Sequence, residues 1–351
     1  MTQSSILFVG QTVAGSRTVQ RIKEFEKLGC RVEVVPTNLA GASYEDKPGL
    51  MTRLRYQLRY PADAAGAGKQ ILNSLNGNQF DVLWLERAVE IGANTLRRVK
   101  KLNPKIKIVW YAEDDMMNPL HRTRQVEAAM PYYDLWVTTK SFNAEPKEVP
   151  TFGVKNILFV NNSYDPTLHR PINPSEQDRS DFGAEVSFVG TFEKYRADSL
   201  VYLARQGVPV RVWGNGWAAY KDKVPGLLIE GRPAYDDEYV KVICSSKINL
   251  CFLRKENRDL QTCRSIEIPA SGGFMLHERN AEMAGIFNED REAAYFASDQ
   301  ELLEQCKKWL LDFTAREEVA KNGLDKVTIG SFSHSERLQE ILDAARQAGP
   351  E

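Results

Sequence analysis

The sequence predicts an α/β protein made of two Rossmann-like domains, each a doubly wound parallel sheet covered by helices. The chain has 351 residues and is 42% apolar, which exceeds the usual size of one domain and favours two cores. Short β-branched runs alternate with longer amphipathic stretches, as in βαβ units. This alternation occurs twice, on either side of a proline-rich, charged stretch, and two domains follow from it.

The first domain is expected over residues 1–165. Strands are predicted at 6–10, 31–36, 81–86, 106–112 and 135–139. The helix after the first strand has Val19, Ile22, Phe25 and Leu28 on one face and ends at Gly29, a residue common after helix C-termini. A second helix near 91–102 carries a run of Arg and Lys, which is typical of a solvated face.

Residues 166–184 are expected to be a linker, because they hold three prolines, many charges and no periodicity. The second domain is expected over 185–330, with strands at 185–189, 208–213, 227–230, 248–252 and 273–276 and helices at 299–311 and 315–323. The last segment, 331–351, has Leu338, Ile341, Leu342 and Ala345 on one helical face. We expect this helix to return to the first domain.

Composition excludes several classes of function. Lys and Arg total 46 against 47 Asp and Glu, so no net positive charge gathers nucleic acid. The longest apolar runs are far shorter than the roughly 20 residues of a membrane span, although peripheral membrane contact stays open. The N-terminus does not resemble a signal peptide. The five cysteines include no CxxC pair, and the four histidines are scattered along the chain. A cytoplasmic protein without a metal site is predicted.

Open parallel sheets bind ligands beyond the carboxyl ends of their strands, so two such domains facing across a cleft predict one site between them. Four residues of the second domain follow predicted strands in tight turns: Gly190 and Thr191, then Gly214 and Asn215. Backbone amides at such turns are suited to phosphate. Ordinary turn formation explains glycines there equally well.

The segment RSIEIPASGGFMLHE, residues 264–278, places Arg264 and Glu267 one helical turn apart beside an apolar strand. Glu267 is a candidate bidentate acceptor for ligand hydroxyls, and the guanidinium of Arg264 is suited to diphosphate. Two structural alternatives stay open. Glu267 is also placed where acids favour a helix start, and the two residues are spaced for a simple ion pair.

These stretches resemble the group 1 glycosyltransferases, and within them the CgeB-like branch of spore-maturation-type proteins. The resemblance covers about a third of the chain, through VSFVGTFEKYRADSL, VPVRVWGNGW, INLCFLR, RSIEIPASGGFMLHER and EAAYFASDQELLE. It implies the GT-B fold, a ribose-binding role for Glu267, and diphosphate contacts from Lys194, Arg196 and Arg264. The family's first acid, eight positions earlier, corresponds to Asp259, a shorter residue in a charged stretch where surface charge is the default interpretation.

In the first domain, the resemblance places Gly10 and Gly15 of GQTVAGSR in the cleft; their spacing is not that of a dinucleotide fingerprint. Glu113, Asp114 and Asp115 follow the fourth strand, where mutual repulsion would raise a carboxyl pKa toward that of a general base. We expect Asp114 and Asp115 to act on the acceptor. A helix cap or a cation site is the alternative.

The predicted function is glycosyl transfer from a nucleotide diphosphate sugar, with a UDP-sugar favoured, to a hydroxyl of a glycan, protein or small molecule. The resemblance implies a hexosyltransferase whose arginines and lysine take the place of a metal on the leaving diphosphate. No other cofactor is expected. A catalytically silent protein that binds nucleotide sugars or glycans, and a sugar-nucleotide epimerase or hydrolase on the same fold, are the alternatives.

Overall fold

The computed structural model describes residues 4–44 and 46–348, and within them the chain forms two compact units. The first unit comprises Met1–Asn161 and His334–Glu351, and the second comprises Asn162–Ser333. Within the described residues, none of the helices combines the length and the apolar composition that a membrane span requires.

The first unit contains one parallel sheet and its covering helices. Its strands are β1 (Ser5–Gly10), β2 (Arg31–Pro36), β3 (Val82–Glu86), β4 (Lys107–Ala112), β5 (Leu135–Thr138) and β6 (Ile157–Phe159). Its helices are α1 (Arg17–Lys27), α2 (Leu50–Gln57), α3 (Ala67–Ser74), α4 (Ala93–Leu102), α5 (Arg124–Ala129) and α13 (His334–Gln347), with short 3-10 turns at Met130–Tyr132, Ser141–Ala144 and Val149–Phe152.

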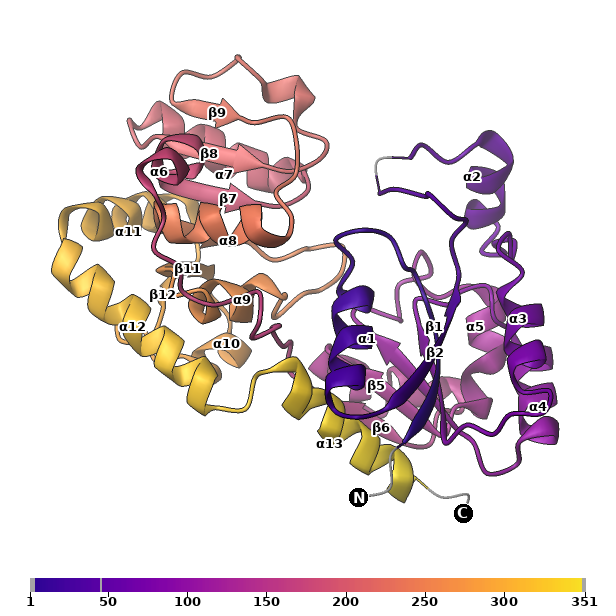
Figure 1. The fold of residues 1–351 in the computed structure, drawn as a ribbon. Coiled ribbons are helices and arrows are strands. Elements are labelled where there is room, and N and C mark those ends of the chain that lie inside the picture. Colours follow the sequence, from indigo (N-terminus) through magenta and orange to yellow (C-terminus); the bar gives the residue numbers. More distant parts are fainter. Residues whose placement is uncertain (1–3, 45, 349–351) are drawn as a thin grey trace. The chain divides into compact units, whose positions relative to one another are not determined.

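The sheet of the first unit runs in the order β2-β1-β3-β4-β5-β6 and is buried on both faces. Alternate residues along each strand point to opposite faces. Phe8 and Trp84 lie in the core under α1, whereas Leu7 and Leu83 lie in the core under α3 and α4. Figure 1 shows α1 on one side of these strands and α3 and α4 on the other. Two buried faces explain the near-continuous apolar runs in the sequence.

Helix α13 completes one face of the first unit, although nearly the whole second unit precedes it in the chain. Its residues Leu338, Ile341 and Leu342 are buried in the same core as Phe25 of α1. This apolar face is the one recognised in the sequence by its helical spacing. The unit therefore depends on both ends of the chain.

The second unit repeats the architecture. Its strands are β7 (Ala184–Val189), β8 (Val210–Trp213), β9 (Leu227–Ile229), β10 (Ser246–Cys251), β11 (Met275–Glu278) and β12 (Ala294–Phe296). Its helices are α6 (Glu176–Phe182), α7 (Lys194–Arg205), α8 (Asp236–Ser245), α9 (Arg264–Ala270), α10 (Ala281–Ile286), α11 (Asp299–Leu311) and α12 (Phe313–Ile329), with a 3-10 turn at Ala218–Tyr220.

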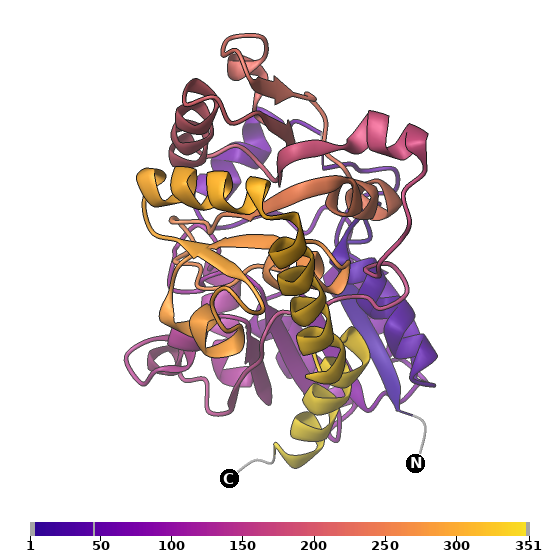
Figure 2. The ribbon, with the colours of Figure 1, turned by 90° about the vertical axis from the view of Figure 1, so that its left-hand side faces the viewer.

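The sheet of the second unit is parallel and has the order β12-β11-β10-β7-β8-β9. Read from β9, the strands follow the 3-2-1-4-5-6 order of dinucleotide-binding folds. Helices α7 and α11 cover one face and α8, α9 and α10 contribute to the other. Helices α11 and α12 meet at a bend at Asp312, whose side chain accepts a hydrogen bond from the amide of Ala315 (Figure 2). Two doubly wound parallel sheets confirm the predicted fold class.

The structure differs from the sequence prediction at the edges. The edge strands β6 and β12, of three residues each, were not predicted, whereas β9, an edge strand of the same length, was. The expected linker, 166–184, contains α6 and belongs to the second unit. A reciprocal capping box between Ser175 and Asp178 begins that helix, and the burial of Phe182 fixes its end.

Candidate functional site

The strand order changes direction at one point in each sheet. In the second unit β7 and β10 are adjacent although β8 and β9 lie between them in the chain, and in the first unit β1 is adjacent to β3. Ligands of doubly wound sheets bind at the carboxyl ends of the strands that flank such a point. A ligand site is therefore expected among the residues that follow β7 and β10 in the second unit, or β1 and β3 in the first.

Two arginines meet at the switch point of the second unit. Arg196 comes from α7, which follows β7, and Arg264 begins α9, which follows β10. Each guanidinium carbon lies 5.7 Å from the centre of the Phe188 ring. Burial, together with the positive charge of Arg264, lowers the pKa of Arg196. Both guanidinium groups thus lie near the Phe188 ring, and the charge of Arg264 acts on Arg196.

Neither arginine is satisfied by the protein. Nη2 of Arg196 and Nε of Arg264 are buried without a hydrogen-bond acceptor. Among the described residues, Arg264 donates a single side-chain hydrogen bond, from Nη2 to the carbonyl of Phe252 at 3.4 Å. Arg196 is held by the carbonyl of Thr191 at 3.1 Å and by Glu193 at 3.3 Å. Buried donors without acceptors are rare in proteins, and a pair of them indicates an anionic ligand.

Glu267 lies one turn further along α9 and is 6% exposed. Nδ1 of His169 accepts a hydrogen bond from the amide of Asp165, so Nε2 carries the proton and faces Oε1 of Glu267 at 3.9 Å. That distance is too long for a hydrogen bond. Burial and the charge of Glu267 raise the pKa of the Tyr239 phenol, whose oxygen has no partner at hydrogen-bond distance.

These contacts remove one of the two alternatives for Glu267 and Arg264. Among the described residues no ion pair joins the two side chains, whereas Glu267 does lie in the first turn of α9, where acids favour a helix start. Glu267 also forms a buried acceptor flanked by His169 and Tyr239, with two donors close but not bonded. Sequence reasoning missed Tyr239, because it lies on α8, 28 residues before Glu267 in the chain.

The two glycine turns of the second unit pack on each other. A Cβ at Gly214 would lie 1.9 Å from the carbonyl oxygen of Gly190, so no larger residue fits there. That carbonyl also accepts a hydrogen bond from Nε1 of Trp217 at 2.9 Å. Close backbone approach thus explains Gly190 and Gly214 without a ligand. Thr191 is exposed and Asn215 half-buried at the same edge, where the carbonyl of Asn215 accepts from the amide of Phe192.

Lys194 and Arg196 do not act together in the structure. Lys194 is exposed and forms an ion pair with Asp198, four residues on, at 2.6 Å, whereas Arg196 is buried. Residues two apart on a helix face opposite directions. The structure therefore separates the two cations that were predicted to act together.

Asp259 also differs from its prediction as a surface charge. It is buried and accepts hydrogen bonds from the amide of Arg254 at 3.3 Å and from the side chain of Asn257 at 2.7 Å. These bonds hold the loop after β10 in shape. These hydrogen bonds of the Asp259 carboxylate stay within its own loop.

At the switch point of the first unit, a buried ion network occupies the space. Arg21 donates to both carboxylate oxygens of Glu86, at 2.8 and 2.5 Å, and to Glu113 at 3.1 Å. Thr18 adds a bond to Glu86 at 2.7 Å. Gly10 ends β1 against the backbone of Glu86, and Gly15 has a positive φ of 74° in the turn before α1.

The acids after β4 take three different roles. Burial acts to raise the pKa of Glu113, but Arg17 and Arg21 overcome it and hold that pKa well below its usual range. The prediction that three free acids repel one another is therefore wrong, because Glu113 is paired with two arginines. Asp115 is buried and accepts from the amide of Met117 at 3.0 Å and from Asn143 at 2.9 Å, as a structural residue would.

Asp114 remains at a surface. It lines a hollow of about 100 Å³ at the carboxyl ends of β3 and β4, together with Gln11, Arg87 and His121. Nδ1 of His121 lies 3.9 Å from the Asp114 carboxylate. A carboxylate next to an imidazole in a small polar hollow has the composition of an acid–base site.

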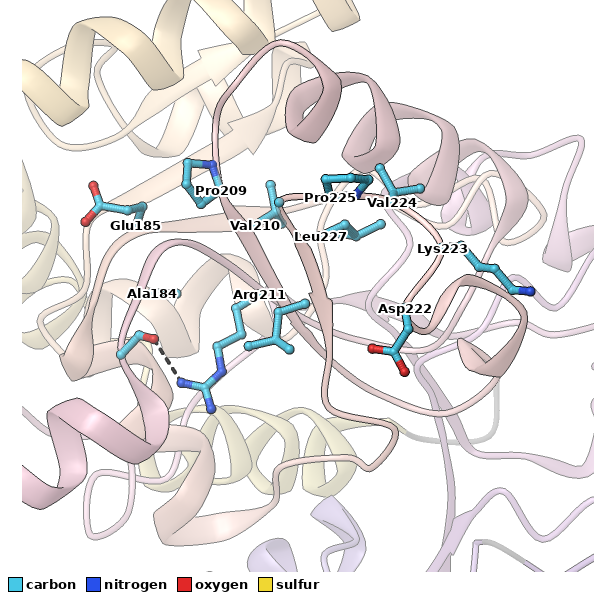
Figure 3. Close-up of a pocket in the computed structure, with 13 residues that line it drawn as sticks. Ala184, Glu185, Pro209, Val210, Arg211, Asp222, Lys223, Val224, Pro225 and Leu227 are labelled. Atoms are coloured by element: carbon cyan, nitrogen blue, oxygen red, sulfur yellow. Dashed lines mark hydrogen bonds between the residues drawn. The ribbon is translucent and has the colours of Figure 1, made fainter.

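A larger hollow of about 680 Å³ lies at the opposite end of the second sheet, where β7, β8 and β9 begin (Figure 3). Its most prominent polar residue, Arg211, is already bonded to Glu230 and to the carbonyls of Gly183 and Asp181. The amino ends of parallel strands are not where such folds bind ligands. We do not assign the candidate site there.

One known family matches part of the chain. A family described as glycosyl transferase-like matches residues 196–343, which span most of the second unit and much of α13. The matched segment includes Arg196, Arg264 and Glu267. No curated protein sequence matches the chain.

Solved structures share the whole fold at low identity. A glycosyltransferase from Rickettsia africae aligns with a TM-score of 0.66 and 10% identity over 99% of both chains. A sucrose-phosphate synthase from Thermosynechococcus elongatus gives 0.65 and 10% over 99% of this chain and 100% of that one. Anabaena HepE, solved with UDP and glucose, gives 0.62 and 13% over 97% and 100%. The chain has the GT-B fold of glycosyltransferases.

Proposed function

We propose that this protein transfers a hexose from a nucleotide diphosphate sugar to a hydroxyl group of an acceptor. The second unit holds the donor and the first unit holds the acceptor. The observation that carries the proposal is a group on the second unit: the buried Glu267 carboxylate together with two buried nitrogen atoms, Nη2 of Arg196 and Nε of Arg264, that have no acceptor among the described residues. In a nucleotide diphosphate, the ribose hydroxyls would donate to the carboxylate and the diphosphate oxygens would accept from the two arginines.

The ribose fits the environment of Glu267. Two neighbouring hydroxyls donate to the two oxygens of one carboxylate, and a charged acceptor makes each bond stronger than a neutral one. His169 and Tyr239 flank the carboxylate, and neither is within hydrogen-bond distance of it, so both of its oxygens stay available to the ribose. Structures with this fold have been solved with UDP and glucose and with UDP-glucose, which favours a UDP-sugar as the donor.

The diphosphate fits the two arginines. Negative charge grows on the diphosphate as the bond to the sugar breaks, and fixed cations stabilise that charge most in a partly buried place. Arg264 is half-buried and reaches the surface, while Arg196 lies behind it. Together with the exposed amide edge at Thr191 they form the proposed leaving-group site.

The acceptor hydroxyl is proposed to bind at the hollow of the first unit. Asp114 takes its proton as the new glycosidic bond forms, and His121 supports the charge of that carboxylate. Arg87 and Gln11 offer hydrogen bonds that orient a polyhydroxyl acceptor.

We further propose a cytoplasmic protein of the CgeB-like branch. Cys30, Cys244, Cys251 and Cys306 form no disulfide in the part of the chain that the structure describes, which suits a reducing compartment. A silent nucleotide-sugar receptor would keep Glu267 and the arginines but would not need Asp114 and His121 at a hollow. The acid–imidazole pair therefore favours an enzyme.

The test is donor binding by the variant Glu267→Gln. The amide keeps the shape of the side chain but loses the charged acceptor, so affinity for UDP-glucose or the preferred donor should fall by about 1–3 kcal/mol. Isothermal titration calorimetry measures this directly.

The matched control is Glu185→Gln, because Glu185 lies on β7 of the same sheet and pairs with Lys247 at the far end. It should bind the donor like the wild type. Equal affinity of Glu267→Gln and the wild type would remove the ribose assignment, and equal loss in both variants would show a general effect on the unit.

Turnover should survive EDTA, because the two arginines take the role of a divalent cation on the diphosphate. Initial rates with and without chelator measure this. Loss of activity that manganese or magnesium restores would overturn metal independence while leaving the donor site in place.

A further inference from the structure

Helix α2 carries apolar side chains that the first unit leaves uncovered. None of its residues is buried. Four of the side chains in and just after the helix are 48 to 85% exposed: Leu50, Met51, Leu54 and Leu58. We call these four residues the α2 patch. A short helix with no buried residue is not held in place by a core, so its apolar side chains need another explanation.

The α2 patch forms one continuous face. At 100° per residue, its four members fall within an arc of about 100°, which is the width of an amphipathic stripe. Tyr56 lies on the opposite side of the helix and lines the hollow that contains Asp114. The patch therefore points away from the body of its unit. Figure 1 shows α2 standing apart from the sheet, at the end of the loop that follows β2.

The surroundings of the patch are positively charged. Residues 47–60 contain Lys47, Arg53, Arg55 and Arg59 and no acidic residue. Arg59 forms an ion pair with Glu127 at 2.6 Å. The other three are exposed, and within the described parts of the chain no ion pair involves them. On the helical wheel, Arg55 and Arg53 lie just beyond the two edges of the apolar arc.

We propose that the α2 patch docks on the surface of an anionic lipid bilayer. The aliphatic side chains enter the boundary between headgroups and acyl chains, and the flanking cations lie level with the phosphates. Each cation near such a surface adds electrostatic attraction. The proposal goes beyond glycosyl transfer and rests on the first unit alone.

Other occupants fit less well. A second copy of the chain on the same patch would place the cations of Arg53 and Arg55 against those of its partner, which opposes association. Single-stranded nucleic acid would use aromatic side chains for base stacking, but the outward arc is aliphatic. Only an apolar layer beneath negative charge matches both features.

If the proposed function holds, the docking also defines the acceptor class. Because α2 has the lipid-facing patch on one side and the Asp114 hollow on the other, the acceptor hydroxyl would be carried by an amphiphilic molecule at the membrane surface. The binding test below needs no turnover, so its result is independent of that function.

Vesicle sedimentation of the full chain tests the docking. The wild type should bind vesicles of phosphatidylcholine with phosphatidylglycerol, bind phosphatidylcholine alone more weakly, and lose affinity as salt rises. Leu50→Ser combined with Leu54→Ser should reduce the partition coefficient about tenfold or more. Because neither side chain is buried, the melting temperature of this double variant should stay that of the wild type.

The matched control is Leu311→Ser combined with Ile329→Ser, two equally exposed aliphatic residues of the second unit. It should bind vesicles like the wild type. The proposal is overturned if the wild type does not bind anionic vesicles, or if the α2 variant binds as well as the control. It is also overturned if the α2 variant abolishes a concentration-dependent dimer, or binding to a DNA oligonucleotide, without any vesicle binding being present.

Discussion

The two units have the same architecture and opposite electrostatics at corresponding places. At the switch point of the first sheet, Arg21 makes three hydrogen bonds to Glu86 and Glu113, and burial does not prevent those carboxylates from raising its pKa well above the usual value. At the switch point of the second sheet, Arg196 and Arg264 lie side by side with nitrogen atoms that have no acceptor.

The difference teaches how a fold is adapted to a ligand. A buried ion network that is complete serves the stability of its unit, since removing one member leaves an uncompensated charge. A buried group of like charges that is incomplete costs stability and becomes satisfied only when an anion binds. Among two similar sheets, the unsatisfied one is where the nucleotide is expected.

The largest effect should follow from breaking the complete network. Arg21→Met leaves Glu86 and Glu113 short of their main cation, and the free energy of unfolding should fall by about 3–5 kcal/mol. Urea denaturation followed by tryptophan fluorescence measures the change. Donor affinity of the folded fraction should stay unchanged, because the donor is assigned to the other unit.

Arg31→Met is the control for this change, since Arg31 is exposed on the same unit and donates to the carbonyl of Gln79. It should cost little stability. Adding Glu86→Leu to Arg21→Met should recover part of the loss, as a double-mutant cycle for a coupled pair requires. A loss below about 1 kcal/mol for Arg21→Met would contradict the importance of the network.

The next effect separates two neighbouring acids of the first unit. Asp114→Asn should lower turnover by about 100-fold or more, the scale of a general base, without changing donor affinity. Asp115→Asn should leave turnover nearly intact and lower the free energy of unfolding by about 1–2 kcal/mol. Its carboxylate accepts hydrogen bonds from the backbone amide of Met117 and from the side chain of Asn143.

Initial rates, calorimetry with the donor and melting temperatures on both variants decide the matter. Normal rates for Asp114→Asn would remove it from the reaction. A lower donor affinity in either variant would place these acids at the nucleotide instead of the acceptor.

The smallest effect concerns the incomplete cluster of the second unit. Arg264→Met should weaken donor binding about tenfold, since a charge-assisted contact to the diphosphate is lost. Stability should change little, because the protein itself gives Arg264 only one long hydrogen bond. Calorimetry and thermal unfolding of the same samples measure the two quantities.

Lys194→Met provides the control, because this lysine follows the same strand but pairs with Asp198 at the surface. Its donor affinity should stay within about twofold of the wild type. If Lys194→Met weakened donor binding as much as Arg264→Met, Lys194 would also contribute to the donor site. The assignment of Lys194 to the surface would then be wrong.

Much of the fold could be predicted, and part of the site. Ten of the strands were predicted from apolar runs in the sequence, whereas β6 and β12 were missed and show only in their pairing with β5 and β11. The sequence pointed to Arg196, Arg264 and Glu267, which the structure brings to one sheet edge or its neighbourhood. It also grouped Lys194 with Arg196 and Asp115 with Asp114, and the structure separates both pairs.

The sequence by itself determined the two sheets, their order of elements and the apolar face of α13, because these depend on periodicities of 2 and 3.6 residues that are local in the chain. The tertiary structure alone decided which charges are satisfied. Arg21 meets Glu86 and Glu113 from 65 and 92 residues away, and Arg196 meets Arg264 without an acceptor between them. The energy of a buried charge depends on all the groups around it, and those groups come from distant strands.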